Sequence, residues 1–237
     1  MEKERVVVYI PARSGSKRII NKNKKLLDGK PIILHVIEVL NQLNWIEQIC
    51  VSTDDPEIKS LVESSGAIAL DLRAKELSDD YCTFKNLLEK DISRFEKHLK
   101  LNDNYSILMV LPTAALIDAE LLSNAKNKFH ESKTDFLFAA KEYEISAFWA
   151  FEETPDNFKP LFPDKLNERS QDLPKTFSDA GLFYFLKSNL IRSSFKTWFH
   201  AINKTFFIVN KEIAIDVDTP DDWKLLEHYF LNRKIKA

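Results

Sequence analysis

Residues 6–23 read VVVYIPARSGSKRIINKN, and this stretch decides the expected fold. Residues 6–10 form an apolar run of branched and aromatic side chains, which is typical of a strand buried on both faces of a parallel sheet. Pro11 ends the run, because proline has no N–H to donate to a sheet ladder. A first strand of this kind predicts an α/β fold in which parallel strands alternate with helices.

The loop after this strand combines small residues with cations. It contains Arg13, Ser14, Gly15, Ser16, Lys17, Arg18 and Lys22, and no acidic residue lies between Arg5 and Asp28. Open α/β sheets bind ligands at the carboxyl ends of their strands, and backbone N–H groups, hydroxyls and cations suit a polyphosphate. The loop therefore predicts a nucleotide site. Its spacing matches neither GxxxxGK[ST] nor GxGxxG, so a basic surface turn is the simpler alternative.

The remaining pattern predicts a three-layer α/β/α fold, Rossmann-like, with a mostly parallel central sheet. Further strands are expected at 46–51, 67–70, 105–111 and 136–140, and helices from Pro31 and at 57–64, 81–99 and 118–130. We expect one domain over residues 1–237, because the chain has no repeat and no linker-like segment. Residues 141–180 are irregular, proline-interrupted and aromatic-rich, which indicates an inserted lid or dimer arm.

Two polar segments follow predicted strands. Asp55 precedes Pro56 and is interpreted as a helix cap, whereas Asp54 has no assigned role. Arg73 lies after the strand expected at 67–70 and, from the residues alone, is interpreted as a surface residue. Ser78 and Asp79 precede the next helix and are interpreted as caps.

Residues 213–223, IAIDVDTPDDW, carry the acidic residues of most interest. In a strand, Asp216 and Asp218 would project from one face, where two carboxylates repel unless a cation neutralises them. A hard divalent ion with oxygen ligands is the usual solution, so these residues are the metal candidates. The alternative is a solvent-facing strand end. Thr219 and Pro220 then begin the last helix as cap and first helical residue.

Composition excludes several other classes of protein. The net charge of −2 argues against a nucleic-acid-binding surface, and no apolar run approaches the roughly 20 residues that span a bilayer. The first residues lead into a strand instead of a signal peptide, so we expect a cytoplasmic protein with no membrane partner. Cys50 and Cys82 show no CxxC or zinc-type spacing and are expected to be reduced thiols.

Several motifs together resemble one enzyme family. PARSGSKRIINKN is similar to the PARxxSKRxxxKN-like loop of the nucleotidyltransferases that make CMP-activated nonulosonic acids. The STDD, LRxxxLxxD and DxDTPxD elements of that family match residues 52–55, 72–80 and 216–222. Within the family, NERSQDLPK at 167–175 and DAGLFY at 179–184 look most like the pseudaminic acid cytidylyltransferases. Leu111 and the residues after Thr113 depart from the Gln-Pro-Thr and Ser-Pro-Leu-Arg pattern of the sialic acid branch.

The resemblance implies a nucleotidyltransferase fold and a role for each matched residue. Arg13, Lys17 and Asp218 would be catalytic; Arg13, Ser16, Lys17, Asn23 and Arg73 would contact the nucleotide; Arg169, Gln171 and Asp179 would bind the sugar; and Asp216 and Asp218 would hold Mg²⁺. Asp80 would lie at the rim of the active site, and Gly181 would let the backbone approach the substrate. The partners would be CTP, an acidic nine-carbon sugar and a second copy of the chain, paired through residues 141–180.

The implied reaction joins CTP and pseudaminic acid, or a close nonulosonic acid, into a CMP-sugar and pyrophosphate. Synthesis of CMP-sialic acid, CMP-legionaminic acid or CMP-Kdo is the same chemistry on another acid. Two further alternatives are a non-catalytic nucleotide-binding protein and a protein-interaction module built on residues 148–162. From the residues without the resemblance, Arg169 could be a solvated loop residue. The sequence does not decide the sugar, the number of metals or the general base.

Overall fold

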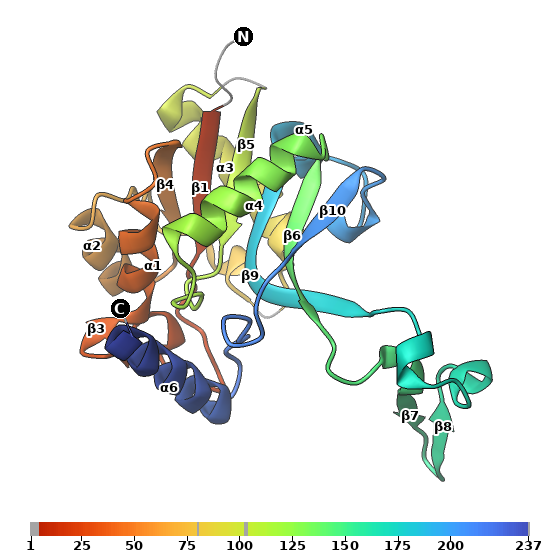
Figure 1. Ribbon diagram of the computed structural model, residues 1–237. Coiled ribbons are helices and arrows are strands. Elements are labelled where there is room, and N and C mark those ends of the chain that lie inside the picture. The colour runs from red at the N-terminus through yellow and green to blue at the C-terminus, as the bar shows by residue number, and fades with distance from the viewer. Residues whose placement is uncertain (1–4, 80, 102–103, 237) are drawn as a thin grey trace.

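The computed structural model describes residues 5–79, 81–101 and 104–236 (Figure 1). Its main sheet contains β1 (Arg5–Pro11), β4 (Ile46–Ser52), β5 (Tyr105–Val110), β6 (Phe136–Glu142), β9 (Phe177–Lys187) and β10 (Lys204–Ile208), in the order β10-β6-β9-β5-β1-β4. Strand β1 pairs in parallel with β4 and β5, and β10 pairs in parallel with β6. Strand β9 runs antiparallel between β5 and β6, so the sheet is mostly parallel, as predicted.

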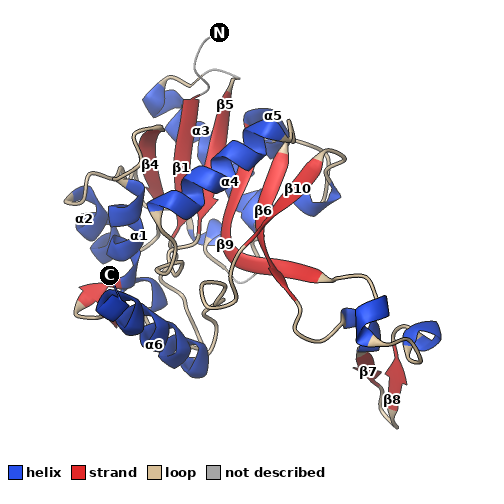
Figure 2. Ribbon diagram, viewed as in Figure 1, coloured by secondary structure: helices blue, strands red, loops and turns tan. Residues whose placement is uncertain are grey.

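Helices cover both faces of this sheet (Figure 2). One face packs against α1 (Ile32–Leu40), α2 (Pro56–Glu63) and α4 (Ala119–Glu131), and the other against α3 (Phe84–Leu99) and the short α5 (Ser188–Ile191). Side chains alternate along β1, so Val8 and Ile10 join the first core and Val7 and Tyr9 join the second. The continuous apolar run of β1 is therefore buried on both sides, and the three-layer α/β/α prediction is confirmed.

A third apolar cluster holds the two ends of the chain together. Helix α6 (Pro220–Lys236) contributes Trp223 and Leu226, which pack with Ile19 of the basic loop and with Ile215 and Val217 of the acidic segment. The small hairpin of β2 (Leu26–Leu27) and β3 (Lys30–Pro31) supplies Leu27 to the same cluster. Burial of these side chains fixes residues about 200 positions apart against each other.

Two of the predicted strands are wrong. At 67–70 only Ile68 bonds to the sheet, through Ile49 and Val51, and forms an isolated bridge beside Cys50. Residues 213–217 form a turn and an extended segment without a ladder. Burial alternates only from Ile215 to Val217, where the two apolar side chains pack on α6 and Asp216 between them is exposed, whereas Ala214 is buried as well.

Helix starts follow the capping side chains. The Asp55 carboxylate accepts N–H groups from Glu57 and Ile58 at 2.9 and 3.4 Å, which confirms its predicted cap. Helix α3 begins later than expected, because Thr83 caps it by accepting the N–H of Asn86. Asp79 instead accepts N–H groups within the preceding turn. Asp80 lies outside the described residues.

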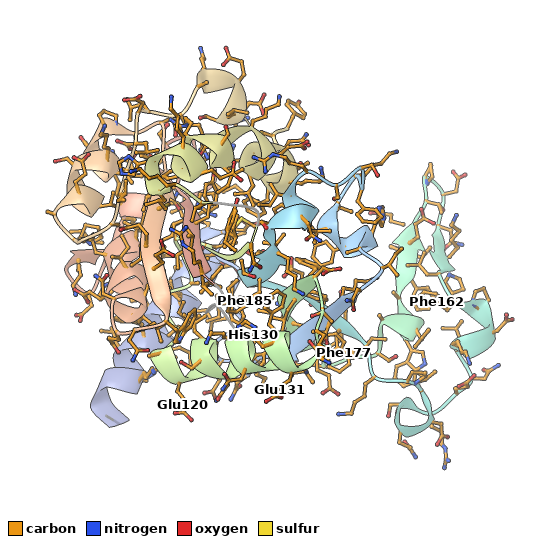
Figure 3. The ribbon with its side chains drawn as sticks, turned by 90° about the horizontal axis from the view of Figure 1, so that it is seen from above. Glu120, His130, Glu131, Phe162, Phe177 and Phe185 are labelled. Atoms are coloured by element: carbon orange, nitrogen blue, oxygen red, sulfur yellow. The ribbon has the colours of Figure 1, made fainter. Side chains whose placement is uncertain are left out.

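Within the predicted insertion at 141–180, residues 143–176 connect β6 to β9 and project from the body of the molecule as an arm (Figure 1). The arm contains an antiparallel hairpin of β7 (Phe151–Glu153) and β8 (Phe158–Pro160), with short 3₁₀ helices at Ala147–Trp149, Pro163–Lys165 and Ser170–Asp172. Figure 3 shows Phe162 on this projection, far from Phe185 in the body. The arm is therefore more ordered than the irregular sequence pattern indicates, and its role in dimerisation stays a prediction.

Two further predictions concern the cysteines and membranes. Cys50 is buried, Cys82 is partly buried, and both are free thiols, as expected. Within residues 5–79, 81–101 and 104–236, no helix has both the length and the apolarity to cross a bilayer. The cytoplasmic location stays a prediction.

Candidate functional site

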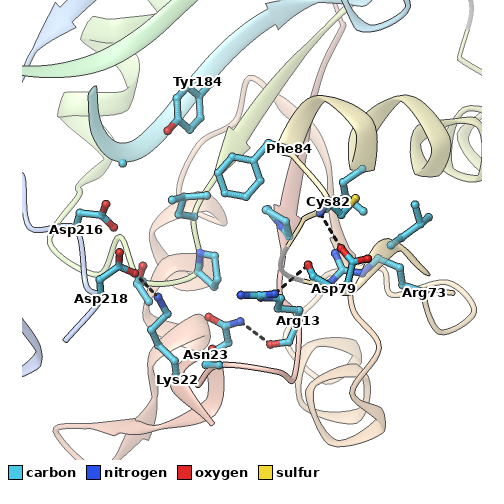
Figure 4. Close-up of a pocket in the computed structure, with 18 of the residues that line it drawn as sticks. Arg13, Lys22, Asn23, Arg73, Asp79, Cys82, Phe84, Tyr184, Asp216 and Asp218 are labelled. Atoms are coloured by element: carbon cyan, nitrogen blue, oxygen red, sulfur yellow. Dashed lines mark hydrogen bonds and ion pairs between the residues drawn. The ribbon is translucent and has the colours of Figure 1, made fainter. Parts of the chain in front are cut away.

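A cavity of about 460 Å³ opens at the carboxyl edge of the parallel strands (Figure 4). It is lined by the loop after β1, the turn before α3, the residues after β5, the first residues of β9 and the acidic segment before α6. A second hollow of about 380 Å³ shares Arg13, Ser16, Lys22 and Asp218 with it. The sheet thus brings the predicted nucleotide loop and the predicted metal candidates to one site.

Most of the predicted site residues meet here. The larger cavity is lined by Arg13, Ser16, Asn23, Arg73, Asp179, Gly181, Asp216 and Asp218, and Lys17 lines the adjoining hollow. Arg169 and Gln171 line neither and lie on the arm. The nucleotide and metal candidates are therefore grouped within one chain, whereas two of the three sugar candidates are not.

Hydrogen bonds from the body of the protein hold the basic loop. The buried Asn23 donates from Nδ2 to the Arg13 carbonyl at 2.9 Å. Ser14 donates from its backbone N and from Oγ to Asp54, at 2.8 and 2.7 Å. Arg13 donates from Nη1 to the Asp79 carbonyl at 3.0 Å. Asp54, for which the sequence predicts no role, thus holds Ser14 of the loop through two hydrogen bonds.

Arg73 is a buried cavity residue, so its interpretation as a surface residue is wrong. It is 5% exposed, and its backbone N donates to the Thr53 carbonyl at 2.8 Å. Its Nε donates to Ser78 Oγ at 3.1 Å, and Nη2 lies 3.7 Å from Asp54 Oδ1. A buried guanidinium with few neutralising partners offers positive charge to an anion in the cavity.

Asp218 is paired with cations of the basic loop. Its carboxylate accepts from Arg18 Nη2 at 2.8 Å and from Lys22 Nζ at 3.3 Å, and Lys22 also donates to the Val217 carbonyl at 2.6 Å. Figure 4 shows Lys22 and Asp218 side by side at the cavity wall. Sequence reasoning assigned neither cation a specific role, although both belong to the cation-rich loop.

Asp216 differs from Asp218 in its contacts. Its side chain forms no hydrogen bond or ion pair with any residue that the structure describes. Burial raises the pKa of its carboxyl, and the nearby charge of Asp218 raises it further. Gly181 has φ +63°, and a Cβ there would lie 3.0 Å from Asp216 Cγ. The glycine therefore makes room for this carboxylate.

Asp216 and Asp218 carry oxygen ligands of the kind that Mg²⁺ binds, and the magnesium role stays a prediction. They are hard oxygen ligands, and Mg²⁺ usually binds one or two carboxylates together with substrate phosphates. In the described part of the chain, no group of three or more His, Cys, Asp or Glu residues could hold a metal ion. A metal ion held by this pair would need further ligands from substrate or water.

The cavity wall formed by Phe84 and Tyr184 is aromatic. Phe84 is 41% exposed, and its ring centroid lies 6.4 Å from that of Tyr184. Tyr184 donates to Asp179 Oδ2 at 2.6 Å, and Oδ1 of Asp179 accepts the Gly181 N–H at 3.0 Å. Burial, and then the charge of Asp179, raises the pKa of the Tyr184 hydroxyl. Phe84 is not predicted from the sequence, because no pattern distinguishes it from a core residue at a helix start.

Arg169 lies in an open part of the arm. Its side chain is 72% exposed and pairs with Asp172, from Nε to Oδ2, at 2.7 Å. Gln171 is also exposed. Because neither residue lines the cavity of its own chain, their role in sugar binding stays a prediction.

Comparisons with known proteins agree with this geometry. Residues 7–197 match the family described as cytidylyltransferase. The chain is 34% identical over 219 residues to the pseudaminic acid cytidylyltransferase of Campylobacter jejuni, covering 90% of each. It is 26% identical over 225 residues to the CMP-N,N'-diacetyllegionaminic acid synthase of Legionella pneumophila, covering 94% of this chain and 95% of that one. A solved CMP:2-keto-3-deoxy-manno-octonic acid synthetase complexed with CTP has a TM-score of 0.70 at 14% identity, over 97% of this chain and 100% of that one, a likeness of fold.

The matched segment carries the basic loop, Arg73 and Asp179, which all line the site. The acidic pair lies beyond that segment in sequence and within the same cavity in space. A full-length relative above 30% identity supports the same assignment. On these grounds the chain belongs to the cytidylyltransferase family.

Proposed function

We propose that the chain transfers CMP from CTP to a nonulosonic acid, with pseudaminic acid as its first candidate, and releases pyrophosphate. The observation that carries this proposal is the meeting of the basic loop and the acidic pair in one cavity. Phosphoryl-transfer chemistry needs both parts, cations and N–H donors for the triphosphate and carboxylates for its metal. The Campylobacter jejuni relative, 34% identical, supports the choice of sugar.

The loop residues hold and neutralise the triphosphate. Ser16, Asn23 and Arg73 orient the nucleotide, while Arg13 and Lys17 offset charge on the transferred and leaving phosphates. The anomeric hydroxyl of the sugar attacks the α-phosphorus in line and gives up its proton to water. The bond between the α-phosphorus and the bridging oxygen breaks, and pyrophosphate leaves.

Asp216 and Asp218 would hold the Mg²⁺. When bound, this ion supplies positive charge at the phosphate oxygens as the α-phosphorus is transferred. Arg18 and Lys22, which pair with Asp218, are placed to neutralise that carboxylate before nucleotide and metal enter. Asp179, positioned by Tyr184, faces the sugar from the start of β9.

The sugar side of the site is completed by a second copy of the chain. The arm exposes Phe151, Phe158 and Leu161 at 56%, 66% and 50%, an apolar surface suited to pairing with another arm. Such pairing would bring Arg169 and Gln171 of one chain to the cavity of the other. There the Arg169 guanidinium, now paired with Asp172, would form a bidentate pair with the sugar carboxylate.

A second candidate substrate is legionaminic acid. The Legionella pneumophila relative covers 94% of this chain, although at a lower identity of 26%. A non-catalytic nucleotide-binding role is less well supported, because the cavity retains Arg13, Asp216 and Asp218 together.

The test is pyrophosphate release with CTP and Mg²⁺, comparing pseudaminic, legionaminic, sialic and Kdo acids. The Asp218→Ala variant removes a metal candidate, and Asp221→Ala is its control, because Asp221 is 86% exposed and pairs only with Lys224 among the described residues. Release with pseudaminic acid that is lost in Asp218→Ala alone supports the proposal. Release with a different acid keeps the mechanism and changes the sugar, and CTP binding without release from any acid leaves a binding protein.

A further inference from the structure

Helix α3 carries two clusters of the same design, one at each of two neighbouring strands. In the first, Tyr9 of β1 donates to Asp91 Oδ2 at 2.8 Å, and Arg94 Nε donates to Asp91 Oδ1 at 2.7 Å. In the second, Tyr105 of β5 donates to Glu96 Oε1 at 2.6 Å, and Arg192 Nη1 donates to the same oxygen at 3.0 Å. Each joins a strand tyrosine, an α3 carboxylate and an arginine.

The two clusters differ in the other contacts that their arginines make. Arg94 also donates from Nη1 to the Asp71 carbonyl, at 2.6 Å, and so reaches the segment that enters the cavity. Arg192 binds Glu96 with both terminal nitrogens, and its side chain is 48% exposed. The first cluster is therefore linked to the site, whereas the second is an ion pair at the far end of the helix.

Asp71 lies two residues before Arg73, in a segment without helix or strand. Two hydrogen bonds hold this segment to the body, one from the Arg73 N–H to the Thr53 carbonyl and one from Arg94 to the Asp71 carbonyl. These two hydrogen bonds anchor the backbone on either side of Leu72. The direction in which Arg73 enters the cavity therefore depends on both anchors.

Burial makes the first cluster sensitive to loss of a partner. Tyr9 is 0% and Asp91 1% exposed, and a buried carboxylate is tolerated when its oxygens are hydrogen-bonded and its charge is paired. Burial raises the pKa of the Tyr9 hydroxyl, and the Asp91 charge raises it further, so Tyr9 remains a donor. In this cluster the Arg94 guanidinium bridges the Asp91 carboxylate and the Asp71 carbonyl.

We propose that Asp91 and Arg94 are positioning residues for the nucleotide, acting through the Asp71 carbonyl on the direction of Arg73. This inference rests on the proposed role of Arg73 in CTP binding. Neither residue lines the cavity, so they touch no substrate and their effect is indirect.

The experiment compares Arg94→Met with Arg192→Met, which removes the matching arginine of the second cluster. CTP affinity is measured by titration calorimetry without sugar, kcat and the KM for CTP by pyrophosphate release, and stability by urea unfolding. We expect Arg94→Met to weaken CTP binding and raise the KM about five- to twentyfold with kcat within about threefold. Arg192→Met should lower stability and leave the affinity within about twofold.

A conservative variant separates positioning from charge. Arg94→Lys keeps a cation beside Asp91 but lacks the planar fork that spans Asp91 and the Asp71 carbonyl. We expect it to regain part of the lost stability while its CTP affinity stays as low as that of Arg94→Met. It also carries the test if Arg94→Met fails to fold. Full recovery of CTP affinity in Arg94→Lys would overturn the proposal.

Arg73→Met distinguishes this inference from the proposed function. If Arg94 acts through Arg73, then adding Arg94→Met to Arg73→Met causes no further loss of affinity, although each single change does. If Arg73→Met leaves CTP affinity unchanged, the nucleotide role of Arg73 fails and the inference fails with it. If Arg73→Met weakens CTP binding and Arg94→Met matches Arg192→Met, the proposed function survives and the positioning role is overturned.

Discussion

Polar side chains of the cavity are buried and hydrogen-bonded within the chain, whereas apolar side chains of the arm are exposed to solvent. In the cavity, Asn23 and Arg73 are each 5% exposed, and both make hydrogen bonds within the chain. On the arm, Phe151 and Phe158 are 56% and 66% exposed. The cavity is thus organised before any ligand arrives, whereas the arm presents apolar surface to solvent.

This difference predicts separate binding roles for the cavity and the arm. A prearranged polar cavity lowers the ordering cost of binding a charged nucleotide. An exposed cluster of aromatic residues on a projecting hairpin is typical of a protein-protein contact. We therefore propose that one chain binds the nucleotide and that the sugar carboxylate binds at the contact between two chains.

The largest expected effect concerns the cavity alone. Asp218→Asn keeps the size of the side chain and removes the charge that would hold Mg²⁺, so kcat/KM should fall at least about 10³-fold. Asp221→Asn, three residues along, should change it less than twofold. Steady-state pyrophosphate release measures both, and a loss smaller than about tenfold in Asp218→Asn would contradict the metal role.

The next effect concerns the arm. Phe151→Asp with Phe158→Asp places charge in the apolar surface, so a dimer held by the arm should dissociate at micromolar concentration. We expect turnover to fall about 100-fold, while CTP affinity stays within about twofold because the nucleotide residues belong to one chain. Sedimentation equilibrium measures the dissociation of the dimer, and calorimetry measures the CTP affinity. A dimer that persists, or CTP binding lost along with it, would mean that the division is wrong.

A smaller effect is expected from Arg169→Met. Loss of a bidentate guanidinium should raise the KM for the sugar acid about 10- to 100-fold and leave CTP affinity unchanged. Lys175→Met is the matched control, because Lys175 also lies at the arm, is 72% exposed, and pairs with Glu142. Equal behaviour of the two variants would remove Arg169 from the sugar site.

The smallest effect is on stability. Because burial and then Asp218 raise the pKa of Asp216 in the folded protein, ionising this carboxyl disfavours the native state. Asp216→Asn should therefore stabilise the protein without Mg²⁺ at about pH 7, by less than about 1 kcal/mol since the side chain is solvent-screened. The gain should shrink as the pH falls and vanish below about 3.9, the ordinary value in the unfolded chain. Urea unfolding across this range measures it, and a gain independent of pH would contradict the cause.

Local patterns predicted most of the fold and of the nucleotide side. The apolar run of β1, the caps and the helical spacing are short-range signals, and parallel strands bring their carboxyl ends to one edge by geometry. Arg13, Ser16 and Asn23 follow β1 and lie at this edge as predicted, whereas Asp216 and Asp218 reach the same cavity through the packing of their segment on α6.

The sequence could not predict features that depend on distant packing. The alternation at 213–217 predicts a strand, but α6 provides the apolar surface that a neighbouring strand would otherwise supply. The bonds of Asp54 to Ser14, and the burial of Arg73, depend on contacts across the sheet edge that leave no local pattern.

The division of the site between two chains is tested most directly by mixing two impaired variants. Asp218→Asn carries a defective cavity and an intact arm, and Arg169→Met carries the reverse. After subunit exchange, half of the dimers are mixed, and each has one site with both parts intact. We predict that pyrophosphate release at low sugar concentration rises to about a quarter of the wild-type rate. A mixture that releases no more than the average of the two variants measured apart would contradict it.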